Sequence, residues 1–83
     1  MTLPSSNRVS IDDVVVSAEH CLKRPLEPIE RLILKSSWQG LPYTAIATTS
    51  GYANVYVREV GARLWQALSE ALGTKVTKKR LPW

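Results

Sequence analysis

The stretch that decides the fold is residues 43–72, YTAIATTSGYANVYVREVGARLWQALSEAL. A short segment centred on Ile46 and Ala47 leads to the turn at Gly51, and a longer apolar stripe follows the turn. The stripe recurs at helical spacing and consists of Val57, Val60, Gly61, Leu64, Leu68 and Ala71. Because glycine adopts a positive φ at little cost, Gly51 suits a tight turn. The pattern predicts a helix over about 43–49 and a longer one over about 53–72, joined as a helix-turn-helix.

Small and branched residues around the turn are typical of helix-turn-helix proteins. Ala47 lets the two helices approach closely, and Val57 and Val60 fix the angle at which they cross. The alternative is another kind of helical bundle that contains a glycine turn. The large aromatic side chains that we expect in the core are Trp38, Tyr52 and Trp65.

A first helix is predicted over about residues 11–23. Ser10 is a suitable N-cap, and Asp12 and Asp13 follow in the first turn, where the helix dipole favours acids. The β-branched run Val14-Val15-Val16 leaves a strand open as the alternative. The capping signal favours the helix.

A second helix is predicted over about residues 26–38, with Pro28 tolerated near its start and Gly40 as a C-cap candidate. Its inner face is expected to carry Ile29, Leu32 and Ile33, and its outer face Glu30, Arg31 and Lys35. The sequence therefore predicts an all-α fold, a compact four-helix domain with a helix-turn-helix and a basic C-terminal tail. We expect residues 1–9 to be a flexible leader, residues 10–74 the helix-turn-helix domain and residues 75–83 the tail.

The positive charge is concentrated at the C-terminal end of the sequence. The net charge of the 83 residues is +4, and residues 75–83 alone hold four basic side chains and no acid. The rest of the chain is balanced, which tempers a nucleic-acid interpretation because phosphate contacts supply much of the affinity for DNA.

Several functional classes find no support in the sequence. The single cysteine, Cys21, cannot form an intramolecular disulfide, and no Cys/His spacing indicates zinc, which favours a reducing compartment. No apolar run approaches the roughly 20 residues of a membrane helix, and the first ten residues do not resemble a signal peptide. With one histidine and no recognisable triad or phosphate loop, we expect a cytoplasmic protein that is not an enzyme and has no metal or cofactor.

The order of motifs resembles known regulatory domains. Residues 26–30, 38–40 and 43–47 resemble in order the four-helix modules of LuxR-type regulators and of the DNA-binding region of sigma factors. Closer still is the N-terminal helix-turn-helix of cyanobacterial vWA-MoxR-associated proteins, often fused to AAA-like or NB-ARC modules. The matching residues are Ser37-Trp38-Gln39-Gly40, Tyr43, Ile46-Ala47, Gly51-Tyr52, Gly61, Leu64-Trp65-Gln66, Leu68-Ser69, Leu72-Gly73 and Lys75-Val76-Thr77-Lys78-Lys79. Those proteins continue beyond the domain, so a free-standing relative and an excised domain both stay open.

If double-stranded DNA is the partner, helix 53–72 is expected to lie in the major groove. The expected DNA-binding residues are Thr44, Asn54, Val55, Arg58, Glu59, Ala62, Arg63, Lys78, Lys79 and Arg80. Arg58 is the candidate for a bidentate guanine contact and Val55 for a thymine methyl group. Asn54 either caps the helix or contacts a base, and Glu59 either accepts from cytosine or pairs with Arg63.

The alternative function is a protein-interaction adaptor of a signalling or NTPase-linked system, which uses the same fold without DNA. The neutral body and the fusions in similar proteins favour it. The partner would be a signalling domain or a second copy of the chain in a homodimer, bound at an exposed helix. Convergence of Arg58, Arg63, Lys35 and the tail on one face would favour DNA binding and a role as a transcriptional regulator. A neutral and apolar face on helix 53–72 would favour the adaptor.

Overall fold

The computed structural model describes residues 10–83, in which four helices form the fold. They are α1 (Ile11–Leu22), α2 (Pro28–Trp38), α3 (Tyr43–Ser50) and α4 (Asn54–Leu72). The predicted all-α four-helix fold is confirmed, and the strand alternative for the first segment is wrong. The predicted leader, residues 1–9, lies outside the described residues.

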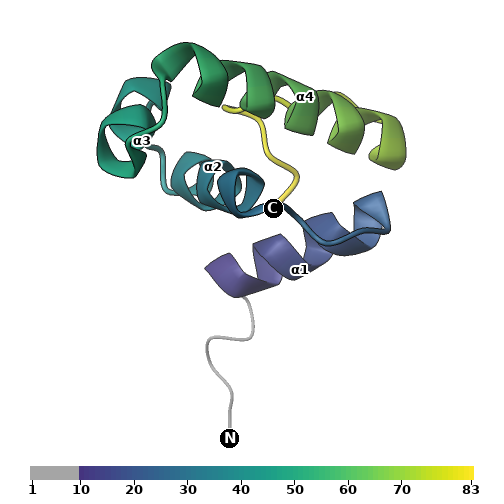
Figure 1. Cartoon of the computed structure of the whole chain (residues 1–83). Helices are drawn as coiled ribbons and strands as arrows, with labels where there is room; N and C mark the ends of the chain where they lie inside the picture. The colour runs from purple at the N-terminus through teal and green to yellow at the C-terminus, as the bar shows by residue number, and fades with distance from the viewer. Residues whose placement is uncertain (1–9) are drawn as a thin grey trace, which may run out of the picture.

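The long helix α4 lies across one side of the molecule, with α1 and α2 on the other side (Figure 1). α3 lies at the end where α4 begins and contacts both α2 and α4. α1 contacts α2 and α4, so the three longer helices enclose one core. After α4 the chain turns back, and Val76, Leu81 and Trp83 add to that core.

The core contains the stripe that the sequence predicts. Val57, Leu64 and Leu68 of α4 are fully buried, and Ile46 and Ala47 of α3 belong to the same cluster. Two expected core residues lie instead at the surface. Tyr52 is 43% exposed, because it follows Gly51 in the turn before α4 begins, and Ala71 is exposed in the last turn of α4.

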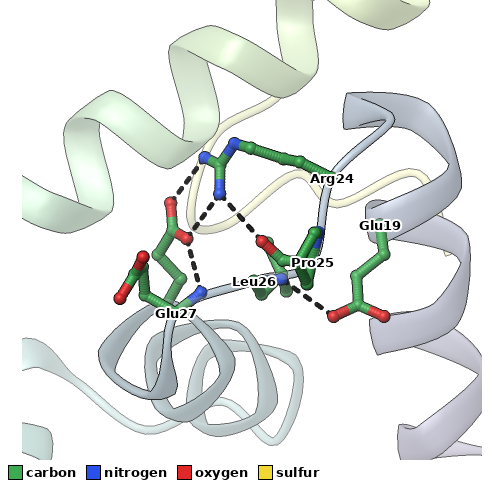
Figure 2. Close-up of polar contacts among 6 residues, drawn as sticks. Glu19, Arg24, Pro25, Leu26 and Glu27 are labelled. Carbon is green, nitrogen blue, oxygen red and sulfur yellow. Dashed lines mark hydrogen bonds and ion pairs between the residues drawn. The ribbon is translucent and has the colours of Figure 1, made fainter.

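Polar groups fix the joint between α1 and α2 (Figure 2). Arg24 donates to both carboxylate oxygens of Glu30, at 2.9 and 2.8 Å, and to the carbonyl of Pro25 at 3.2 Å. Glu30 also accepts from the N–H of Glu27 at 2.8 Å, while Glu19 accepts from the N–H of Leu26 at 2.8 Å.

The placement of Glu30 on the outer face of its helix is wrong, because the residue is only 8% exposed. Arg24 covers it, and the hydrogen bonds from Arg24 hold the pKa of the Glu30 carboxyl below its ordinary value despite partial burial. The predicted cap of the first helix is confirmed. The Ser10 hydroxyl accepts from the N–H of Asp13, and the Asp13 carboxylate accepts from the N–H of Ser10, which completes a capping box.

Candidate nucleic-acid interface

The turn of the helix-turn-helix has the predicted geometry. Gly51 has φ +83° and donates from its N–H to the carbonyl of Ala47 at 2.9 Å, which ends α3. The N–H of Tyr52 then donates to the hydroxyl of Ser50 at 3.2 Å. These bonds turn the chain sharply, so that α4 begins after only three residues outside either helix.

A partly buried hydrogen bond fixes the start of α3 against the middle of α4. The indole N–H of Trp65 donates to the hydroxyl of Tyr43 at 2.8 Å. The Tyr43 ring lies directly over Gly61, where an added Cβ would come within 2.6 Å of the Tyr43 hydroxyl and 2.8 Å of its Cε1. A glycine is therefore needed at position 61, because any larger residue would clash with this ring. The contact holds the first N–H groups of α3 beside α4.

The segment after α4 is attached to the same flank of α4. The N–H of Val76 donates to the hydroxyl of Ser69 at 2.8 Å, and that hydroxyl lies 2.8 Å from the carbonyl of Trp65. The Val76 side chain is only 4% exposed. Thr77 and Arg80 then exchange backbone hydrogen bonds of 3.2 and 3.0 Å, which form a tight turn with Lys78 and Lys79 at its tip.

The basic residues of this turn do not share one orientation. Lys78 is half-buried; it donates to the carbonyl of Leu41, and its ammonium lies 5.3 Å from the centre of the Tyr43 ring. Burial lowers the pKa of Lys78, and the neighbouring charge of Lys79 lowers it further. Lys79 and Arg80 are exposed. The structure thus exposes two of the three tail side chains predicted to bind DNA, Lys79 and Arg80, and turns Lys78 toward the start of α3.

Arg58 lies on the flank of α4 to which α3 and the C-terminal segment are attached. Positions 58, 62, 65 and 69 are separated by four, three and four residues, so they share one helix face. Trp65 and Ser69 make the contacts that hold Tyr43 and Val76. Arg58 and Ala62 continue this face toward the start of α4, and both are exposed.

The other predicted residues of α4 are distributed as follows. Val55, Glu59 and Arg63 are exposed, with Val55 at 73%. Asn54 is the first residue of α4 and not its N-cap, a position held by Ala53. The Asn54 side chain is half-buried, and its Oδ1 has no hydrogen-bond partner among residues 10–83. Thr44 of α3 is exposed.

Two ion pairs occur among residues 10–83, and neither joins Glu59 to Arg63. One is Arg24–Glu30 at 2.8 Å. The other joins Lys35 to Asp12 of α1 at 3.7 Å. Lys35 therefore lies against α1, while Arg58 and the turn of residues 77–80 lie on the flank of α4 that faces α3.

The sequence interpretation missed an exposed aromatic pair at the start of α4. The rings of Tyr52 and Tyr56 lie 5.5 Å apart with a 43° tilt, and both residues are more than two-fifths exposed. The helical stripe contained the needed signal, because Tyr56 lies off the buried positions of α4. Together with Val55, these tyrosines form an apolar surface patch, which we call the tyrosine patch.

Within residues 10–83, no helix combines the length and apolar character that crossing a bilayer requires. No curated protein and no solved structure matches the chain. A family model described as the vWA-MoxR associated protein N-terminal HTH matches residues 7–83. Since that match spans nearly the whole sequence, the chain belongs to the family of N-terminal helix-turn-helix domains of vWA-MoxR associated proteins.

Proposed function

We propose that the domain binds double-stranded DNA through the major groove and acts in transcriptional regulation, in the cytoplasm and as a binding module rather than an enzyme. The observation that carries this proposal is the exposed Arg58 on the flank of α4 that also holds the start of α3 and the basic turn. A helix-turn-helix binds by inserting the start of its second helix into the groove. Arg58 and Val55 make the main base contacts.

Phosphate contacts come from the neighbouring elements. The N-cap of α3 is Pro42, which has no side-chain cap, so the first N–H groups of the helix stay available for an anion. Thr44 lies within this first turn and is exposed. Lys79 and Arg80 add exposed positive charge, which compensates for the neutral body of the domain.

The remaining α4 residues have lesser roles. Glu59 and Ala62 contact base edges next to Arg58, and Arg63 contacts the phosphate backbone. Asn54 is partly enclosed by the fold, so its contribution is to orient the start of α4.

The test is selection of bound duplexes from a random library, followed by fluorescence anisotropy with the selected and scrambled duplexes. We expect Arg58→Ala to weaken binding of the selected duplex by about 5- to 150-fold, equivalent to about 1–3 kcal/mol. Arg31→Ala is the matched control, since Arg31 is exposed on α2 and its removal changes the net charge equally. Failure to enrich any sequence from the library, or an equal loss of affinity in both variants, would contradict the proposal.

A second candidate function is a protein-interaction adaptor, and the tyrosine patch favours it. Exposed aromatic and branched side chains grouped at a helix end are typical of protein contacts. Under this alternative Val55→Asp abolishes association with a partner signalling domain or with a second copy, while Arg58→Ala has no effect. Light scattering at several protein concentrations measures the homodimer directly.

A further inference from the structure

An open cavity of about 860 Å³ lies where the end of α2, the start of α3 and the C-terminal segment meet. Its size falls within the range of small-molecule sites, roughly 300–1,000 Å³. Three aromatic side chains line it, namely Trp38, Tyr43 and Trp83. Trp38 and Trp83 are half-buried and pack against the core, so Trp83 is part of the folded unit.

The charged side chains that line this cavity are both basic. Lys78 and Lys79 line it, and no acidic side chain among residues 10–83 does so. The Lys78 ammonium contacts only a carbonyl oxygen and the face of Tyr43, and it belongs to neither ion pair of the described residues. The positive charge of this half-buried ammonium is therefore not compensated by a carboxylate side chain of the described residues.

A second polar group of the cavity lacks a partner. Ser37 lines the cavity and is only 6% exposed. Its hydroxyl oxygen is buried and makes no hydrogen bond within residues 10–83. This hydroxyl oxygen is enclosed by the fold, so the ligand contacts proposed below do not include it.

We propose that this cavity binds a small anionic molecule with a planar aromatic ring, the ring against Trp38 and Trp83 and the anionic group at Lys78. Aromatic walls supply apolar area for a flat ring, and the uncompensated ammonium selects the negative charge. The proposal does not depend on DNA binding, because Trp38, Trp83 and Lys78, which hold the ligand, make none of the proposed DNA contacts.

The test is a titration of the ¹⁵N-labelled chain with 2-naphthoate, followed by ¹H–¹⁵N correlation spectra. We expect saturable shifts of the Trp38 and Trp83 indole signals and of the backbone amides of residues 77–81. Neutral 2-naphthamide, which has nearly the same shape, is expected to bind at least tenfold more weakly. Cyclohexanecarboxylate, which keeps the charge without the flat ring, is also expected to bind more weakly.

Lys78→Met is expected to weaken 2-naphthoate binding at least tenfold, while Lys75→Met, which removes an exposed charge outside the cavity, leaves it unchanged. If Lys78→Met unfolds the chain, the affinities of the wild-type chain for 2-naphthoate and 2-naphthamide test whether the negative charge is recognised. Equal affinity for the two compounds, absence of saturation at millimolar 2-naphthoate, or shifts centred on Tyr52 and Tyr56 would each overturn the proposal.

Discussion

The hydroxyl of Tyr43 accepts a 2.8 Å hydrogen bond from the indole N–H of Trp65, and this bond joins the first residue of α3 to the middle of α4. The same tyrosine ring carries the Lys78 ammonium on its face. One side chain thus connects the two helices of the helix-turn-helix with the basic turn that follows them. Tyr43 therefore helps to set the relative position of these three elements, together with the bond between Val76 and Ser69.

Tyr43→Phe is expected to lower the free energy of unfolding by about 1–3 kcal/mol. The substitution keeps the ring but leaves the indole N–H of Trp65, a residue that is only 6% exposed, without an acceptor. Urea unfolding followed by circular dichroism measures the change. Tyr56→Phe is the control, because Tyr56 is exposed and its hydroxyl makes no hydrogen bond among residues 10–83, and an equal loss in both variants would contradict the argument.

Gly61→Ala is expected to destabilise the domain although alanine is the better helix former. The gain in helix propensity is about 1 kcal/mol, whereas the new Cβ would lie 2.6 Å from the Tyr43 hydroxyl, which Trp65 holds in place. We expect a net loss of about 1–3 kcal/mol. In a Tyr43→Ala background the clash is gone, so there the same substitution should be neutral or stabilising. A double-mutant cycle of unfolding free energies measures this coupling, and additive effects would refute it.

The sequence predicts those features of the fold that depend on local pattern. The spacing of Val57, Leu64 and Leu68 identifies the buried face of α4 because an α-helix repeats every 3.6 residues. Gly51 marks the turn because positive φ strongly favours glycine. Both signals lie within one element, so no knowledge of distant contacts is needed.

Features that depend on contacts between elements are not predicted. Glu30 has the side chain of a surface residue, and its burial depends on hydrogen bonds from Arg24 in the preceding connector and from the N–H of Glu27. The basic C-terminal segment has the composition of a tail, but Ser69 binds its backbone and Val76 enters the core. Composition likewise leaves open which of Lys78, Lys79 and Arg80 faces solvent.

Glu30→Gln is expected to destabilise the domain at pH 7 by about 1–3 kcal/mol, because it weakens a partly buried charged pair whose arginine is still half in solvent. The pKa of Glu30 is lowered in the folded state, chiefly by its hydrogen bonds with Arg24. A lowered folded-state pKa stabilises the fold above the unfolded-state value, and this contribution is lost as the pH falls below about 4.5 through the folded-state pKa.

Urea unfolding between pH 7 and pH 3 checks this dependence. The wild-type chain should lose stability on acidification more steeply than Glu30→Gln, so the two curves should approach each other at low pH. Glu59→Gln, at an exposed position without an ion pair among residues 10–83, should follow the wild-type curve. Parallel curves for the wild type and Glu30→Gln would show that the carboxyl has the same pKa in both states.

The salt dependence of DNA binding separates the phosphate contacts from the base contacts. Each phosphate neutralised by a basic side chain contributes about −0.9 to the slope of the logarithm of the binding constant against the logarithm of salt concentration. Because Lys79 and Arg80 are exposed, Lys79→Gln and Arg80→Gln should each make that slope shallower by about 0.9, with similar losses for all duplexes. Arg58→Ala should instead reduce the difference between selected and scrambled duplexes and change the slope little.

Arg31→Gln on α2 is the control for these slopes, because it lowers the net charge equally at a position away from the basic turn. A general attraction of a cationic protein for DNA would make all the charge-removing variants alike, including Arg31→Gln. Placement of the basic turn beside the start of α3 predicts instead that only Lys79→Gln and Arg80→Gln flatten the slope. Equal slopes for these variants and Arg31→Gln would therefore show that the turn of residues 77–80 does not belong to the DNA interface.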